Sequence, residues 1–235
     1  MDGLSGGQCY PKLHYIRDQV LFYVNAPIYL IILLENQVFI PDFPVGKLSN
    51  LTATILPMKN KYMSYAIPFF HQKLYFTSYE LKTVKKYGCK PAIGQRHTLF
   101  NWGDIFFATY CCYELTSISL RHTFQGTADI IFGVEWNKDT YYFGNIIEAL
   151  SRDIYCYCVQ SNISEYGDSR IIQPTKKDLM NILKVKGGIN ASVLIGKIDI
   201  QELRVNQKNK NDISDKSVYK PLPAGWDLTK TNMKK

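Results

Sequence analysis

Residues 104–121 read DIFFATYCCYELTSISLR, in which an apolar β-strand pattern passes directly into a polar, helix-compatible segment. A strand that turns sharply into a helix presents a side chain at the edge of its sheet, here Cys111 or Cys112. A thiol near a helix N-terminus is favoured as the thiolate by the helix dipole and by free backbone N–H groups. The alternative is that both cysteines are small buried apolar residues, which is the common environment of free cysteine.

The chain around this segment alternates between strand and helix patterns. β-Branched and aromatic runs bounded by Gly, Pro or Asn predict strands at 29–34, 51–56, 104–112, 128–135, 156–162 and 192–200. Apolar residues at helical spacing predict helices at 114–122 and 141–153. Strands that alternate with helices are typical of layered α/β folds, so we expect an α/β protein.

The composition is that of one globular domain. The 235 residues are 46% hydrophobic and 14% aromatic, which suits a sizeable, sheet-rich core. The longest apolar run, 26–34, falls well short of the roughly 20 residues that a membrane helix needs. The N-terminus lacks the basic and apolar regions of a secretory signal. We therefore expect a cytoplasmic protein that does not bind membranes.

The cysteines and histidines predict neither a disulfide framework nor a metal centre. Cys111 and Cys112 are adjacent, and Cys156 and Cys158 alternate within a strand pattern, unlike the cysteines of disulfide-stapled domains. No CxxC motif occurs, and the four histidines are scattered along the chain. This spacing does not match that of known zinc motifs.

The positive charge is concentrated at one end of the chain. The net charge is +8, and residues 204–235 hold eight Lys and Arg against three Asp. Residues 206–235 are rich in Asn, Lys and Asp, so we expect a basic, flexible C-terminal tail. A solvated tail explains the charge better than a nucleic-acid surface, because no recognition motif accompanies it.

Two segments carry a resemblance to a known family. Cys112-Tyr113-Glu114, with Arg121 further along, resembles the nucleophile elbow of the nitrilase (carbon–nitrogen hydrolase) superfamily. HQKLYFTSYE, residues 71–80, resembles the catalytic-lysine segment of that family and identifies Lys73, with Glu80 as the supporting glutamate. Lys73 precedes Cys112 by 39 positions, a separation that fits the family.

The resemblance extends over about residues 48–205. Downstream segments supply Trp136 in a loop and a strand that ends in Asn162, before a turn with Gly167, Ser169 and Pro174. The family implies an α-β-β-α sandwich, here residues 1–205, in which 1–47 are unassigned and the N-terminus is incomplete. It also implies a homodimer, no metal or organic cofactor, and substrate contacts from Tyr113, Glu114 and Trp136.

The family mechanism needs a general-base glutamate that is hard to place in this chain. The family implies that Cys112 attacks a nitrile or amide carbon, Lys73 stabilises the oxyanion, and an upstream glutamate transfers the proton. No Glu precedes Glu35, which follows an apolar strand but lies only 38 positions before Lys73. Either Glu35 is the base in a contracted domain, or the base is missing because the chain is shortened, or the site is vestigial.

Two functions therefore remain open at the level of sequence. The first is hydrolysis of a small amide, nitrile or carbamoyl compound through a cysteine thioester. The second is a catalytically impaired, nitrilase-like interaction module. Residues 165–171 (EYGDSRI) and 186–191 (KGGINA) look similar to the branch that accompanies reverse transcriptases in bacterial defence systems, which favours the second reading.

Overall fold

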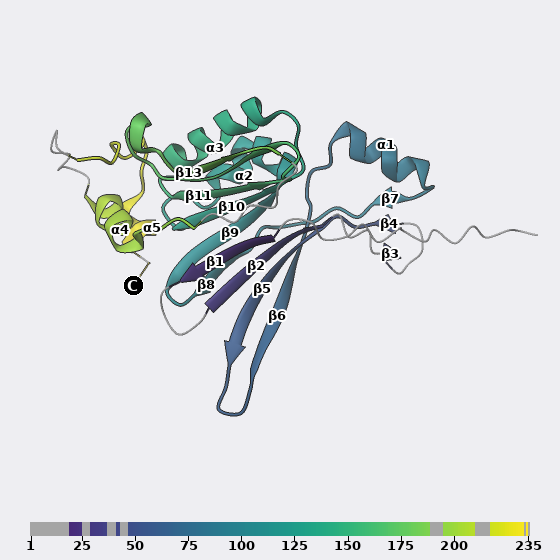
Figure 1. Ribbon diagram of the computed structural model, residues 1–235, viewed down its shortest axis with the longest axis horizontal. Helices are drawn as coiled ribbons and strands as arrows, with labels where there is room; N and C mark the ends of the chain where they lie inside the picture. The colour runs from purple at the N-terminus through teal and green to yellow at the C-terminus, as the bar shows by residue number, and fades with distance from the viewer. Residues whose placement is uncertain are drawn as a thin grey trace, which may run out of the picture.

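The computed structural model describes residues 19–24, 29–36, 41–42, 47–188, 195–209, 217–232 and 234 of the chain. Side chains are described from residue 47 onward, except at Lys59. Figure 1 shows a mixed α/β molecule in which helices cover one sheet, and a second, smaller sheet lies on that sheet's other side. The predicted α/β class is confirmed. Within these ranges, no helix has the length and apolar character required to cross a membrane.

The larger sheet has six strands in the order β13-β12-β11-β10-β9-β8. The central strands β9, β10 and β11 are parallel, whereas β8, β12 and β13 pair antiparallel at the two sides. Their bounds are β8 Leu99–Trp102, β9 Ile105–Cys111, β10 Ile130–Glu135, β11 Tyr157–Asn162, β12 Gly167–Ile172 and β13 Asn181–Lys186. Predictions for β9, β10 and β11 are confirmed to within a few residues.

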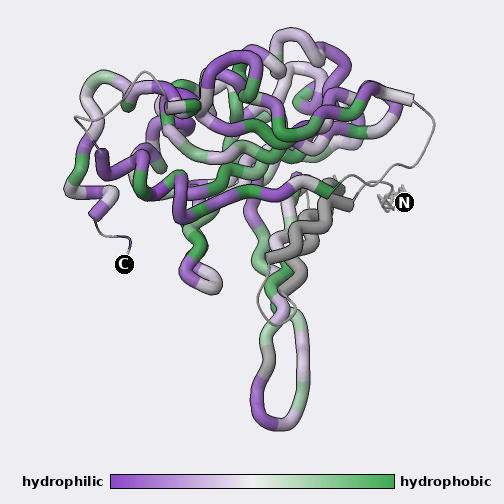
Figure 2. The backbone as a smooth tube through the Cα atoms, turned by 60° about the vertical axis from the view of Figure 1, so that its left-hand side comes forward, coloured by the Kyte–Doolittle hydropathy of each residue, from purple (hydrophilic) through white to green (hydrophobic). Residues whose placement is uncertain are grey.

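The second sheet is antiparallel, in the order β1-β2-β5-β6. Its strands are β1 Gln19–Val24, β2 Tyr29–Asn36, β5 Leu51–Lys59 and β6 Ser64–Gln72. The hairpin of β5 and β6 projects away from the body of the molecule (Figure 2). A small third sheet joins β3 Pro41–Asp42, β4 Lys47–Leu48 and β7 Lys90–Pro91, beside helix α1, Ser78–Lys86.

One face of the six-stranded sheet is covered by helices that follow its parallel strands. These are the short 3₁₀ helix η1 Cys112–Thr116, α2 Ile118–His122 and α3 Thr140–Ile154. Ile147 and Leu150 of α3 are fully buried with Ala108 and Ile131 of the sheet. Burial of each such side chain stabilises the fold by roughly 1.5–3 kcal/mol. The parallel strands therefore end at one edge, where β9 and β10 turn toward helices and β11 turns into β12.

The opposite face of this sheet is covered by β5 and by the C-terminal segment. Leu56 of β5 packs with Phe107 and Val134, while Leu203, Tyr219 and Trp226 cover Tyr155 and Tyr157. Helices α4 Ile200–Lys208 and α5 Leu228–Asn232 lie in this segment, and η2 Lys177–Leu179 precedes β13.

The described part of the C-terminal segment, residues 206–209, 217–232 and 234, is therefore packed where the sequence predicts a flexible tail from residue 206. Trp226 is buried and its indole N–H donates to the Gln207 carbonyl at 3.1 Å, while the Tyr155 hydroxyl donates to the Lys220 carbonyl at 2.6 Å. Lys234 forms an ion pair with the fully buried Asp129 at 3.0 Å. Although most residues of this segment are polar, its few aromatic side chains are enough to hold it against the sheet.

Two predicted elements differ in form. The helix predicted at 114–122 is broken into η1 and α2, because the Ser117 side chain accepts from Leu120 N–H and begins a new helix. The strand predicted at 192–200 is wrong for residues 195–200. Ile200 begins α4, because the Asp199 carboxylate caps the Glu202 N–H. Residues 192–194 of that prediction lie outside the described residues.

Candidate functional site

The predicted lysine lies at the end of β6, in a buried network of three side chains. The ammonium of Lys73 is 2.6 Å from Glu80 Oε1, and both side chains are at least nine-tenths buried. The Asn50 amide donates to the same oxygen at 2.8 Å. The Thr77 N–H donates to Glu80 Oε2 at 2.6 Å, so one carboxylate both caps α1 and holds the lysine.

The electrostatic environment keeps Lys73 charged. Burial lowers the pKa of the Lys73 ammonium, since it disfavours the charged form. The negative charges of Cys111, Glu80 and Cys112, when these groups are ionised, raise this pKa by more than burial lowers it, so it lies above its ordinary value. The same attraction acts on both partners, so a charged Lys73 favours the thiolate forms of the neighbouring cysteines.

The two cysteines lie at a strained turn between β9 and η1. Cys111 ends β9 and is buried, and its thiol lies 3.9 Å from Asn50 Oδ1. Cys112 follows with a φ of 45°, in the left-handed region that a side chain rarely adopts. Strain of this kind costs about 1–3 kcal/mol and is concentrated at functional sites. The strand-to-helix elbow predicted from the sequence is present, with Cys112 at its turn.

A fully buried glutamate ties this elbow to the strand that carries the lysine. The Cys111 N–H donates to Glu114 Oε2 at 2.7 Å, and the Leu74 N–H donates to Oε1 at 2.6 Å. His71 Nε2 lies 3.0 Å from both oxygens. Burial raises the pKa of Glu114, but its contacts with His71, His97 and the Leu74 N–H lower it more, so the carboxylate is charged at neutral pH.

The backbone of Glu35 lies at the same end of the second sheet as Lys73. Glu35 pairs with Thr52 of β5, which pairs with His71 of β6. Glu35 is therefore two strand spacings, about 10 Å, from His71. One position further along the sheet, Asn36 pairs with Leu51 and Leu51 pairs with Gln72, and Lys73 directly follows Gln72.

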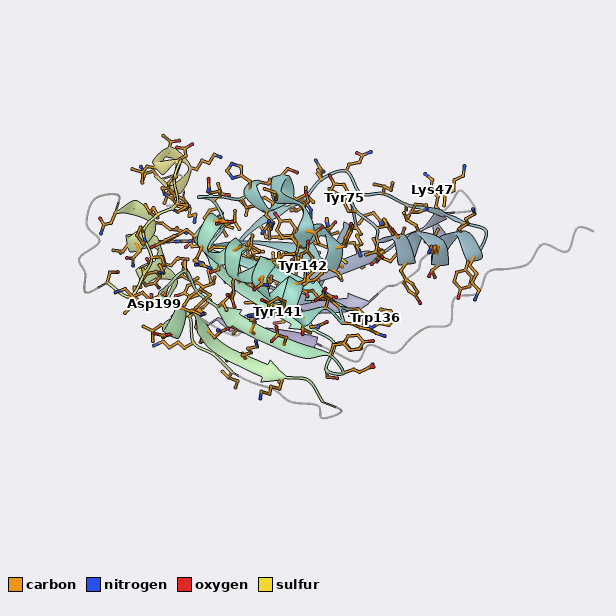
Figure 3. All side chains as sticks on the ribbon, turned by 90° about the horizontal axis from the view of Figure 1, so that it is seen from above. Lys47, Tyr75, Trp136, Tyr141, Tyr142 and Asp199 are labelled. Atoms are coloured by element: carbon orange, nitrogen blue, oxygen red, sulfur yellow. The ribbon has the colours of Figure 1, made fainter. Side chains whose placement is uncertain are left out.

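Aromatic side chains surround this region. Tyr75 lies two positions after Lys73, Tyr113 directly follows Cys112, and Trp136 directly follows β10. Their exposed fractions are 46%, 40% and 53%, respectively. Figure 3 shows Asp199 at one end of the molecule, Trp136 well away from it, and Tyr142 between the two. The loop that bears Trp136 is held by Asn162, whose side chain bonds the Asn137 backbone through both N–H and C=O.

A second buried glutamate lies beside the elbow. Val134 of β10 pairs with Cys111 of β9, so Glu135 occupies the strand position level with Cys112. Glu135 is fully buried and accepts from the Gln160 amide at 3.0 Å. Burial raises its pKa to about 8, against the opposing effects of Gln160 and Arg170. The side chain is therefore largely a neutral acid at pH 7.

This shift predicts a pH dependence of stability that Glu135→Gln removes. The pKa is raised from 4.5 to about 8 on folding, so stability from this group is complete below pH 4.5 and is lost as pH rises through 8. We expect the wild type to lose about 2–4 kcal/mol relative to Glu135→Gln between pH 5 and pH 8. Urea unfolding of both proteins at the two pH values measures the difference, and parallel pH profiles would contradict it.

Several site residues were not predicted from the sequence. Asn50 bridges Glu80 and Cys111, and His71 and His97 lie against Glu114. The residues that they contact are far away in the sequence; Asn50 and Cys111, for example, are 61 positions apart. A local sequence pattern therefore cannot identify them. Gln72 donates to the Asn50 and Ala92 carbonyls and holds two of these segments together.

Comparison with known proteins gives distant structural similarities. No protein-family model matches the sequence, and no curated protein sequence matches it. A CN-hydrolase superfamily protein from Xanthomonas campestris, with an arsenic adduct in its active site, is similar at a TM-score of 0.49 and 11% identity over 68% of this chain. A mutant amidase from Nesterenkonia sp. AN1, with acrylamide added at its active-site cysteine, is similar at 0.42 and 14% over 61%. The chain spans 61% and 56% of these proteins.

Proposed function

We propose that the protein is a carbon–nitrogen hydrolase that cleaves a small amide, nitrile or carbamoyl compound through a thioester on Cys112. The observation that carries the proposal is the buried Lys73–Glu80 pair beside the strained cysteine elbow. A charged lysine held in a fixed direction next to a thiol is an arrangement that stabilises an anion formed during attack. The sequence resemblance to the nitrilase superfamily supports the same assignment.

The reaction assigns one role to each group. For an amide, the Cys112 thiolate attacks the carbonyl carbon, and the Lys73 ammonium donates to the oxygen that becomes negative. The C–N bond then breaks, and a carboxylic acid supplies the proton with which the amine leaves. Water attacks the thioester, returns its proton to that carboxylate and releases the acid. No metal or organic cofactor takes part in this sequence.

Glu35 is our choice for the proton-transferring carboxyl. Its support is the register that brings its backbone to the Lys73 end of the second sheet. Glu80 and Glu114 are less suited to this task, because Glu80 is paired with Lys73 and Glu114 holds the elbow backbone. We therefore assign Glu114 a positioning role, and assign substrate contacts to the exposed Tyr113 and Trp136.

The reactivity of Cys112 toward iodoacetamide at different pH values tests this proposal. We expect Cys112 to be alkylated well below pH 8.5, the ordinary pKa of cysteine being about 8.5, because Lys73 favours its thiolate. Peptide mass spectrometry distinguishes Cys112 from Cys111 and from Cys89. Lys73→Ala should move the reaction midpoint, since it removes a charge beside the thiol. Glu35→Ala should also move it if Glu35 is the proton-transferring carboxyl.

The comparison variant is Lys90→Ala, which changes an exposed lysine in β7 and should leave the profile unchanged. Ordinary reactivity at Cys112 that neither Lys73→Ala nor Glu35→Ala alters would contradict the hydrolase. That outcome would favour the interaction module, for which the similarity of residues 165–171 and 186–191 to the reverse-transcriptase-associated branch is the support.

A further inference from the structure

A cluster of metal-ligating side chains lies beside the cysteine elbow, and two of its three members, His71 and His97, have no role in the proposed reaction. His71 is the next-to-last residue of β6, His97 lies in the loop before β8, and Glu114 lies in η1. One ligand atom from each of the three lies within 4.8 Å of the others. The histidine side chains are 11% and 2% exposed and Glu114 is fully buried, so the cluster is inside the protein.

His97 is the unusual member of the cluster. Neither of its ring nitrogens forms a well-aligned hydrogen bond among the described residues; the ring interacts with the Thr109 backbone, and its Nε2 is 3.9 Å from Glu114 Oε1. A buried polar group without a hydrogen bond costs about 1–3 kcal/mol.

Ring stacking holds the two histidines in their present arrangement. The His71 and His97 rings are stacked with centroids 4.4 Å apart, and His97 also lies 4.4 Å from the Tyr110 ring. Because imidazole binds a metal in the plane of its ring, an ion shared by the two histidines requires the His97 ring to turn out of this stack. Gly94 brings the loop of His97 against β6, since its N–H donates to the Lys73 carbonyl at 3.0 Å. A Cβ at residue 94 would lie 2.0 Å from the Gln72 carbonyl oxygen, so only glycine permits this approach.

We propose that His71, His97 and Glu114 bind a divalent transition-metal ion, most suitably zinc. Two imidazole nitrogens and one carboxylate oxygen form a ligand set that zinc uses when a fourth position stays open. Ligand atoms around tetrahedral zinc are about 3.4 Å apart. The present separations from Glu114 Oε1 are 3.0 Å for His71 Nε2 and 3.9 Å for His97 Nε2.

Glu114 can accept the ion without releasing the elbow. A carboxylate has about four acceptor positions, and the Cys111 and Leu74 N–H groups occupy two of them. The ion replaces the present contact of Glu114 with His71. A cavity of about 110 Å³ beside His71 gives access and is lined by Phe69, Phe70, His71, Thr98, Phe100 and Thr109. The bound ion joins β6 to η1, next to Lys73 and Cys112.

Cobalt and zinc binding by the intact protein tests the site without any reference to hydrolysis. We expect the wild type to retain one equivalent of Co²⁺ after desalting, with the visible absorption of a four-coordinate nitrogen and oxygen site. Zn²⁺ should displace it and raise the melting temperature. His97→Gln should weaken binding more than about 100-fold, because even the second-shell partners of zinc ligands contribute 10–100-fold.

Three comparison variants separate this site from other metal-binding groups. His122→Ala removes an exposed histidine of α2 and should change nothing. Cys111→Ser and Cys112→Ser should also retain the ion, and the cobalt spectrum should lack thiolate charge-transfer absorption. If His97→Gln does not unfold cooperatively, His71→Asn serves in its place. Retention that depends on a cysteine, or no retention by the wild type, would overturn the proposal.

Discussion

Alanine at Cys112 is expected to lower kcat/KM for the best substrate in a panel of small amides and nitriles by at least about 10⁴-fold, since loss of a covalent nucleophile leaves only binding and oxyanion stabilisation. Ammonia release measures the rate. The intact mass of the wild type, quenched during turnover, should include an acylated fraction that the variant lacks. The variant removes one partly buried thiol from a turn and should unfold at nearly the wild-type denaturant concentration.

Cys111→Ser is the matched control, because it changes the adjacent thiol, which faces Asn50 in the buried network. We expect this variant to be acylated and to keep a far larger share of the activity than Cys112→Ala. The opposite ranking would assign the nucleophile to Cys111 and would contradict the argument from the positive φ of Cys112. Equal, small effects of both substitutions would contradict a thioester mechanism.

The parts of this site that were predictable from sequence are those with local patterns. The apolar run before Cys112 predicts a buried strand, and β9 is buried from Phe107 to Cys111. Thr77 and Glu80 have the spacing of a capping box, which explains why the glutamate carboxylate is held at the start of α1, next to Lys73. Each of these features depends on residues within one turn or one strand of each other.

The remaining parts depend on contacts between distant segments, which spacing does not reveal. His97 and Asn50 reach the site only because β5, β6 and the loop after β7 meet at one edge. Trp226 and Tyr219 lie in a polar segment whose average composition resembles a tail, yet both are buried against the sheet. The average composition of a segment does not reveal one or two buried aromatic residues, so the packing of residues 217–232 against the sheet could not be predicted from it.

Methionine at Lys73 is expected to lower kcat/KM by about 10²–10³-fold, the usual effect of removing one oxyanion donor. It should also lower the free energy of unfolding by about 3–5 kcal/mol, because Glu80 then holds a buried charge whose cationic partner is gone. Because this substitution lowers both kcat/KM and the free energy of unfolding, it does not show by itself whether activity falls only through lower stability. Activity measurements and urea unfolding of a second variant distinguish the two causes.

The double variant Lys73→Met/Glu80→Gln removes both charges and keeps similar side-chain volumes. The glutamine side chain introduced at position 80 retains an oxygen that can accept from the Asn50 amide, so we expect most of the lost stability to return. The lost activity should not return, because an oxyanion donor is still missing. Recovery of activity together with stability would show that Lys73 acts only by supporting the fold, and would remove the observation on which the proposed hydrolase depends.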